Sequence, residues 1–247
     1  MNDSPARERL AALAHDLADP ALDLVLAGEG NVSIPTGRGT ILVTPSGARL
    51  AQVAPEELVE VSVDGLVADL DSPRPDHEWL ELILGSRVDK TAARPTVEVA
   101  LHAVIASLAG DVVIAHTHPT DLLVLLCSGR ARDFARTRLI PDHVVMLGVE
   151  DAVVPYVDPG RELAVAVRDV LVSHRETHGV LPALVLVENH GIFVIGSTPR
   201  EALDRTLMAC KFARVFAAGG DIGLGPSSVA RIAGREDEHF RRSLLAD

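Results

Sequence analysis

Short apolar runs rich in Val and Ile alternate along this chain with amphipathic segments of helical period, and this alternation limits the folds open to it. Helices are expected from Ser4 onward and over residues 96–108, 119–126, 162–178 and 199–218, with further short helices in the tail 227–245. Strands are expected after the turn 28–30, over 40–43, 111–116 and 140–148, and on either side of Asn189-His190-Gly191. The pattern therefore predicts the α/β class.

Tight turns, rather than helices, join several of the predicted strands. Gly37–Gly39 connects the first two, and Asp64-Gly65 predicts a second hairpin within residues 59–69. Strands joined in this way pair antiparallel, so the sheet is expected to be mixed or mainly antiparallel. No repeat or linker interrupts the 247 residues. We expect one domain over residues 1–247, with helices on both faces of a central sheet.

Charge and composition exclude several classes of partner. The formal net charge is −12, whereas nucleic acids and anionic lipids require a basic surface. No apolar run approaches the roughly 18 residues of a membrane-spanning helix, and the N-terminus lacks the pattern of a signal peptide. Cys127 and Cys210 stand in unrelated contexts and offer no disulfide framework. These features predict a cytoplasmic protein with no nucleic-acid or membrane partner.

The histidines suggest a metal site. His116 and His118 end an apolar strand, where residues two apart point to the same face, so both imidazoles can reach one ion. Taken alone, such a pair is weak evidence. Most of the other histidines lie on predicted amphipathic helices or at their ends, where they are expected to be solvated and need no function. His190 adds to the evidence of the pair, because it lies in a tight turn between two apolar strands, where packing alone hardly explains a polar ring.

Three neutral imidazoles that leave one coordination position open are typical of a catalytic zinc site rather than a structural one. Manganese, cobalt and iron(II) are the alternatives that the same ligands accept. Glu98 precedes the strand that ends at His116 and can supply a nearby carboxylate. By its position alone, Glu98 is better explained as an acidic residue favoured at a helix N-terminus.

Five short motifs resemble those of the class II aldolase/adducin family, in the order that family has them. They are Gly30-Asn31-Val32-Ser33, Thr44-Pro45-Ser46-Gly47, Pro95-Thr96-Val97-Glu98 with His102 a turn later, His116-Thr117-His118 and Asn189-His190-Gly191. The family includes L-fuculose-1-phosphate and rhamnulose-1-phosphate aldolases and L-ribulose-5-phosphate 4-epimerase. The resemblance extends over nearly the whole chain.

The resemblance implies a three-layer fold and a homotetramer with active sites at subunit interfaces. It implies His116, His118 and His190 as metal ligands and Glu98 as the acid that can ligate the ion and transfer a proton. It also assigns substrate binding to Asn31, Thr44, Ser46, Gly47 and Thr96. Backbone N–H groups, hydroxyls and a helix N-terminus can together bind an anion without net positive charge.

The activity that the resemblance implies is aldol cleavage of a small ketose or ketose phosphate through a metal-stabilised enediolate. Epimerisation, dehydration and decarboxylation use the same site, so the ligands do not discriminate among them. An iron oxygenase and a non-catalytic adducin-like interaction module are the more distant alternatives. A Schiff-base aldolase is disfavoured, because Lys90 and Lys211 lack a convincing buried-strand context.

The chain departs from the family pattern at three points. Val97 replaces a serine of the phosphate motif, and Glu29 adds a carboxylate beside the expected anion, which leaves open whether the substrate is phosphorylated. Family aldolases use tyrosines from a neighbouring subunit as proton donors, but Tyr156 is the single tyrosine here. Asp142 and His143 lie in the segment expected to reach the neighbouring site and are alternative proton donors.

Overall fold

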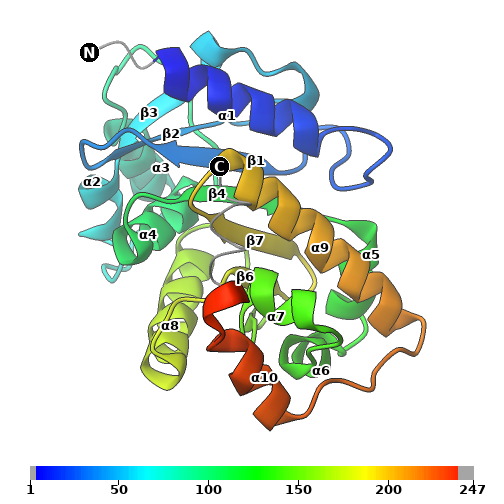
Figure 1. The fold of residues 1–247 in the computed structure, drawn as a ribbon. Helices are drawn as coiled ribbons and strands as arrows, with labels where there is room; N and C mark the ends of the chain where they lie inside the picture. Colours follow the sequence, from blue (N-terminus) through cyan, green and yellow to red (C-terminus); the bar gives the residue numbers. More distant parts are fainter. Residues whose placement is uncertain (1–3, 239–247) are drawn as a thin grey trace.

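A seven-stranded sheet forms the centre of the computed structural model, which describes residues 4–238 (Figure 1). The spatial order of the strands is β3-β2-β1-β4-β7-β6-β5. They are β1 (Asn31–Pro35), β2 (Thr40–Val43), β3 (Val59–Ser62), β4 (Val113–Thr117), β5 (Ala152–Val154), β6 (Leu184–Val187) and β7 (Gly191–Gly196). Within the described residues, β5 and β6 are the one parallel pair, so the prediction of a mainly antiparallel sheet is confirmed.

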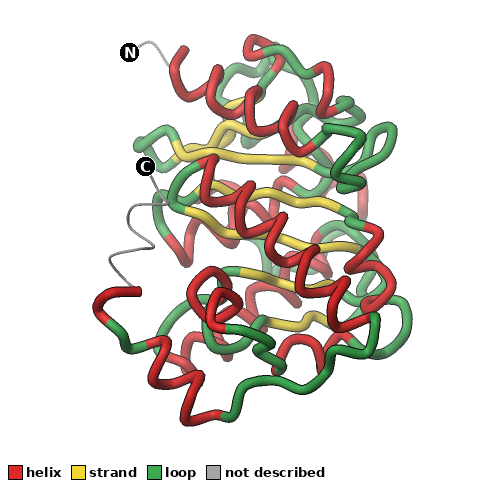
Figure 2. The backbone as a smooth tube through the Cα atoms, turned by 45° about the vertical axis from the view of Figure 1, so that its right-hand side comes forward, coloured by secondary structure: helices red, strands yellow, loops and turns green. Residues whose placement is uncertain are grey.

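Helices cover both faces of the sheet and complete three layers (Figures 1 and 2). One face carries α1 (Ser4–Leu17), α5 (Thr120–Leu126), α6 (Ala131–Arg136), α7 (Pro141–Leu147) and α9 (Pro199–Ala217). The other face carries α2 (Val63–Val67), α3 (Asp76–Gly85), α4 (Val99–Ala109) and α8 (Arg161–His178). The short helix α10 (Pro226–Ala233) packs on α7, and the 3₁₀ turns η1 (Leu50–Gln52) and η2 (Pro55–Glu57) lie near α1. The tail beyond residue 238 lies outside the described residues.

Two apolar cores lie on the two faces, because side chains alternate along each strand. In β7, Ile192 and Val194 face α5 and α9, whereas Phe193 and Ile195 face α4 and α8. In β4, Ala115 joins the first core and Ile114 the second. All of the strands except β3 and β5 are buried almost along their whole length.

Two strand predictions are wrong. Asp64-Gly65 forms no hairpin but lies in the first turn of α2, where the Ser62 hydroxyl accepts a hydrogen bond from Gly65 N–H and caps the helix. The segment 140–148 contains α7 (Pro141–Leu147) rather than a strand, because Pro141 occupies the first helical turn and tertiary packing overrides the β propensity of the valines that follow. No helix among residues 4–238 has the length and hydropathy to span a membrane.

The register of the central strands brings three chain segments to one edge of the sheet. His116 pairs with Asn31 on one side and with Phe193 on the other, so the end of β4 lies beside the beginnings of β1 and β7. The β6–β7 turn carries His190 and lies at the same edge. These distant parts of the sequence therefore meet at one site.

Candidate metal centre

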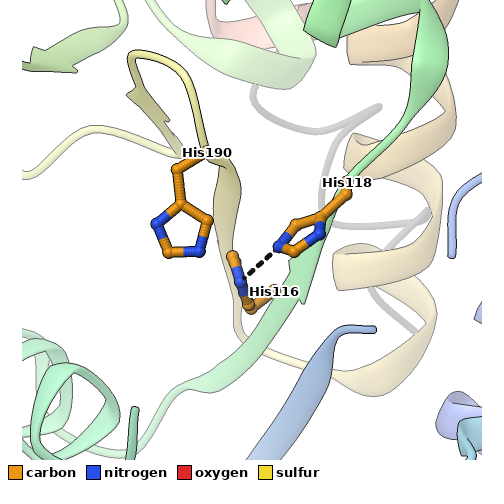
Figure 3. A group of neighbouring side chains, drawn as sticks. All are labelled: His116, His118 and His190. Atoms are coloured by element: carbon orange, nitrogen blue, oxygen red, sulfur yellow. Dashed lines mark hydrogen bonds between the residues drawn. The ribbon is translucent and has the colours of Figure 1, made fainter. Parts of the chain in front are cut away.

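Three imidazoles converge at this edge of the sheet (Figure 3). His116 and His118 come from the end of β4 and the residue beyond it, and His190 comes from the β6–β7 turn. One ring nitrogen from each lies within 4.8 Å of the others, and among the described residues no other group of histidine, cysteine and acidic side chains meets this condition. The Nε2 atoms of His116 and His118 are 3.0 Å apart.

The Asn-His-Gly turn is shaped to bring His190 against β4. Asn189 has a φ of 55°, a left-handed conformation that asparagine tolerates better than most residues. A Cβ at Gly191 would lie 2.4 Å from Cδ2 of His118 and 2.6 Å from the Thr117 carbonyl oxygen. Only glycine permits this close approach, which is why the turn can place its histidine beside the other two.

The orientation of His116 is fixed by its surroundings. Its Nδ1 donates a hydrogen bond to the Ile192 carbonyl oxygen at 2.8 Å, and its ring stacks on Phe193 with centroids 4.2 Å apart. When the ring is neutral, its proton is therefore on Nδ1 and the lone pair of Nε2 faces the cluster. Burial lowers the pKa of His118 to about 4, so this ring stays neutral and able to ligate at pH 7.

Glu98 lies against the same nitrogens. It is the N-cap of α4 and is 5 % exposed. Its Oε2 is 3.1 Å from Nε2 of His116, and its Oε1 is 3.1 Å from Nε2 of His190. Burial alone would raise the pKa of Glu98, but the two histidines outweigh it and hold that pKa below its ordinary value. The carboxylate is therefore ionised and adjacent to the three imidazoles.

This set of donors fits a divalent metal ion. Zinc–nitrogen bonds of about 2.0–2.1 Å in tetrahedral geometry put ligand nitrogens roughly 3.3 Å apart, close to the 3.0 Å between His116 and His118. Three imidazoles and one carboxylate are ligands that zinc, manganese, cobalt and iron(II) all accept. The residues present can therefore hold one such ion.

The segments predicted to bind substrate lie beside this cluster. Thr44 and Thr96 are buried and joined by a backbone hydrogen bond, and Ser46 N–H donates to the Arg94 carbonyl oxygen at 2.8 Å. Ser46 and Gly47 are exposed at the turn. The turn 44–47 and the start of α4 are therefore neighbours, although about fifty residues separate them in the sequence.

Asn31 reaches Glu98 directly, because its Nδ2 donates to Oε2 at 2.8 Å. The sequence predicts no role for His102. In the structure its Nε2 forms a hydrogen bond with the side-chain amide of Asn31, and its Nδ1 forms one with the Ser33 hydroxyl. Two spacings in the sequence are consistent with this hydrogen-bonded group. Asn31 and Ser33 are two apart on a strand, and His102 follows Glu98 by one helical turn.

The predicted proton donors lie elsewhere in the protomer. His143 is fully buried, stacks on Phe212 with centroids 4.0 Å apart, and its Nε2 lies 3.4 Å from Nη1 of Arg138. Asp142 is half-buried at the start of α7. Tyr156 is exposed and donates to Asp158 at 2.9 Å. None of the three contacts the histidine cluster of its own chain through a hydrogen bond or ion pair described in the structure.

The chain belongs to the class II aldolase and adducin N-terminal domain family, whose model matches residues 8–217. Over 176 residues it is 28 % identical to 3-oxo-tetronate 4-phosphate decarboxylase of Pectobacterium atrosepticum, a match that covers 71 % of this chain and 67 % of that one. It is 34 % identical over 125 residues to 5-methylthioribulose-1-phosphate/5-deoxyribulose-1-phosphate aldolase of Rhodospirillum rubrum, covering 48 % and 46 %.

Another relative, the uncharacterized oxidoreductase YuxG of Bacillus subtilis, is 25 % identical over 189 residues, and the match spans only 25 % of its length. Among solved structures, YgbL of Klebsiella pneumoniae superimposes with a TM-score of 0.72 at 24 % identity, covering 94 % of this chain and 99 % of that one. L-fuculose 1-phosphate aldolase gives a TM-score of 0.70 at 18 % identity, with 98 % of each chain covered. These similarities confirm the predicted fold.

Proposed function

We propose that this protein is a divalent-metal-dependent lyase that cleaves a carbon–carbon bond of a small ketose or ketose phosphate. The observation that carries the proposal is the convergence of His116, His118 and His190 on a point beside the ionised carboxylate of Glu98. Zinc is the metal that the three-imidazole set favours, with manganese, cobalt or iron(II) as alternatives. The family and the relatives named above support lyase chemistry on carbohydrate-derived substrates.

When bound, the ion supplies Lewis-acid stabilisation of the negative charge that forms on substrate oxygens during cleavage. The chain itself contributes Glu98, which is buried and ionised and therefore able to accept a proton from a substrate hydroxyl. Asn31 holds the carboxylate by donating to Oε2. Thr44, Ser46 and Thr96 bind the far end of the substrate through their hydroxyl groups, and Gly47 binds it through its backbone N–H group.

The acid that protonates the leaving group is proposed to come from a second copy of the chain, which accords with a homotetramer in the cytoplasm. Asp142 and Tyr156 are the better candidates, because both are accessible at the protomer surface. His143 remains a third candidate, but burial followed by the charge of Arg138 lowers its pKa to about 2. A ring that stays neutral at pH 7 is a poor proton donor.

Decarboxylation of a sugar-derived acid is the second candidate reaction, favoured by the decarboxylase name of two relatives.

Two residues argue against a strongly bound phosphate. Val97 is 44 % exposed beside the substrate segment and offers no hydrogen-bond donor. The Glu29 carboxylate lies 3.7 Å from Nδ1 of His118 and would repel a nearby dianion. Unphosphorylated substrates therefore belong in any screen.

The test begins with metal content, measured by mass spectrometry on protein purified without a chelator or histidine tag. About one ion per chain is expected. Metal-loaded protein is then incubated with ketoses, 3-oxo acids and their phosphate esters, and aldehyde release, epimer formation and CO₂ are measured. Glu98→Gln is the matched control, because it keeps the shape of the side chain and removes the base, and it is expected to lose activity by several orders of magnitude.

Each outcome selects one function. Aldehyde release that depends on Glu98 supports the aldolase, and CO₂ release supports the decarboxylase. Stoichiometric iron with oxygen consumption would replace both with an oxygenase. Protein that binds no metal even after reconstitution would contradict the proposal and favour an interaction module.

A further inference from the structure

A buried chain of hydrogen bonds leads from the sheet to Glu98. The Ser33 Oγ atom is 2.7 Å from Nδ1 of His102, and Nε2 of His102 is 2.5 Å from Oδ1 of Asn31. Nδ2 of Asn31 is in turn 2.8 Å from Oε2 of Glu98. Ser33 and His102 are fully buried, and Asn31 and Glu98 are about 5 % exposed. The chain therefore runs through the protein interior and ends at the base of the proposed reaction.

The Asn31 amide decides the direction of the hydrogen bonds in this chain. Its NH₂ group donates to Oε2 of Glu98 at 2.8 Å, which leaves its carbonyl oxygen, an acceptor only, on the other side. The Asn31 carbonyl then faces His102, whose Nε2 must carry a proton to donate to it. Its Nδ1 consequently holds a lone pair and accepts from the Ser33 hydroxyl. A single tautomer of His102 satisfies all four groups.

The opposite tautomer of His102 would leave the amide oxygen of Asn31 facing the Glu98 carboxylate. With the proton of His102 on Nδ1, Nε2 would accept from the Asn31 NH₂ group, and the amide oxygen would then turn toward Glu98. Two acceptors would face each other at 2.8 Å in a buried site, which costs the free energy of an unpaired buried charge. Burial also lowers the pKa of His102 to about 3, so the ring is neutral at pH 7. A neutral ring is the only state that both accepts and donates.

We propose that His102 is a positioning residue that, as the Nε2–H tautomer, holds the Asn31 amide in the orientation that donates to Glu98 and so fixes this carboxylate beside the metal ligands. The hydrogen bonds described for His102 go to Asn31 and Ser33 and not to His116, His118, His190 or Glu98, so His102 acts through Asn31. The part of the inference that concerns metal affinity rests on the proposed function. The part that concerns the tautomer does not.

The first experiment measures the tautomer itself. The metal-free protein is labelled with ¹⁵N-histidine, and the chemical shifts of both ring nitrogens of His102 are recorded at pH 7. The signals are assigned by comparison with His102→Gln. We expect a protonated Nε2 and an unprotonated Nδ1. A proton on Nδ1, or exchange between the two tautomers, overturns the proposal. Ser33→Ala removes the donor to Nδ1 but leaves the Asn31 carbonyl in place, so the Nε2–H tautomer is expected to persist in this variant.

The second experiment measures zinc affinity by chelator competition. His102→Leu removes both hydrogen bonds and is expected to weaken zinc binding by about 10- to 100-fold, the usual effect of losing a group that orients a metal site. His102→Gln keeps a carbonyl toward Ser33 and an NH₂ group toward Asn31, so its affinity is expected to stay close to that of the wild type. Equal affinities for His102→Leu and wild type overturn the proposal.

A double-mutant cycle separates positioning from general loosening of the fold. If His102 acts through Asn31, then Asn31→Ala combined with His102→Leu should weaken zinc binding no more than Asn31→Ala alone. Additive losses overturn the proposal. Wild-type protein that binds no zinc but has the expected tautomer contradicts the proposed function alone. Zinc binding by a protein with the other tautomer contradicts this inference alone.

Discussion

Two buried clusters in this molecule each combine histidine with a carboxylate, and they differ in where their polar atoms point. The metal cluster consists of His116, His118, His190 and Glu98, and the arginine cluster consists of Arg138, His143 and Asp151. In the metal cluster, ring nitrogens with lone pairs and one carboxylate face a common point. In the arginine cluster, a guanidinium faces the carboxylate, with Nη2 of Arg138 2.8 Å from Oδ1 of Asp151.

The rest of Arg138 is paired with backbone. Its Nε donates to the Gly148 carbonyl oxygen at 2.7 Å and its Nη1 to the Ala135 carbonyl oxygen at 3.0 Å. His143 lies against this guanidinium and stacks on Phe212. The arginine cluster therefore neutralises itself and joins α6, α7 and the start of β5. A buried histidine beside a buried carboxylate is therefore not enough to indicate a metal site. Convergence of ligand lone pairs with no arginine or lysine to neutralise the carboxylate does indicate one.

The largest effect that sharpens this comparison is expected from Asp151→Ala. The substitution leaves the Arg138 guanidinium buried, 1 % exposed, without its carboxylate. Removing one partner of such a pair costs about 3–5 kcal/mol of the free energy of unfolding. Urea denaturation of metal-free protein measures this loss, and zinc affinity at pH 7 is expected to be unchanged in the fraction that remains folded.

A control for this prediction is available on the surface nearby. Arg136 and Glu150 form an ion pair at 3.5 Å, and the Arg136 side chain is 72 % exposed. Arg136→Ala is expected to cost less than about 1 kcal/mol. If Asp151→Ala costs no more than Arg136→Ala, the arginine cluster does not stabilise the fold, and its histidine becomes a candidate for chemistry again.

His118→Ala is expected to lower zinc affinity strongly but to change the free energy of unfolding only slightly. Zinc affinity should fall by at least about 100-fold, or roughly 2.7 kcal/mol, because a ligand is lost rather than a group that orients one. The metal-free free energy of unfolding should change by less than about 1 kcal/mol, since the side chain is 20 % exposed at the edge of the sheet. Isothermal titration and urea denaturation give the two numbers.

His178→Ala is the matched control for His118→Ala. The two side chains are almost equally exposed, at 21 % and 20 %, and each lies 3.7–3.8 Å from a glutamate oxygen. His178 belongs to α8 and lies outside the metal cluster. Loss of zinc affinity in both variants would mean that the metal binds at histidines in general rather than at the three that converge.

The metal cluster could be predicted from the sequence because its geometry follows from short spacings. A strand places His116 and His118 on one face, and the Asn-His-Gly turn identifies His190, since Gly191 admits no side chain. The wrong predictions come from sequence patterns that are compatible with two different local structures. Asp64-Gly65 suits a hairpin turn and also a capped helix start, and only the packing of α2 against α4 decides between them.

The arginine cluster and the His102 chain could not be predicted in the same way. His102 and Asn31 are separated by 71 positions, and their contact depends on how α4 packs against β1. The sequence predicts that His143 lies in a strand segment that reaches the active site of a neighbouring subunit. In the structure His143 belongs to α7, is buried inside its own protomer and stacks on Phe212. Residue types at these positions indicate polarity, but the partner of each polar atom is a tertiary property.

A pH dependence of the free energy of unfolding tests whether His143 is a packed neutral ring or a proton donor. Burial and Arg138 lower the pKa of His143 to about 2 from an ordinary value of 6.5. As the pH falls below 6.5, the unfolded chain takes up a proton at this residue and the folded chain does not, so the free energy of unfolding decreases. One such group contributes at most about 1.4 kcal/mol per pH unit. His143→Gln is expected to lose that contribution between pH 6 and pH 4.

Urea denaturation of wild type and His143→Gln at half-unit pH steps measures the difference in slope. A shallower slope in the variant means that the native ring stays neutral, which suits packing between Phe212 and Arg138 and not proton donation to a substrate. Equal slopes would mean that His143 exchanges its proton in the folded state as freely as in the unfolded one. That result would break the contrast between the two clusters, because the arginine cluster would then contain an accessible acid that a neighbouring subunit can use.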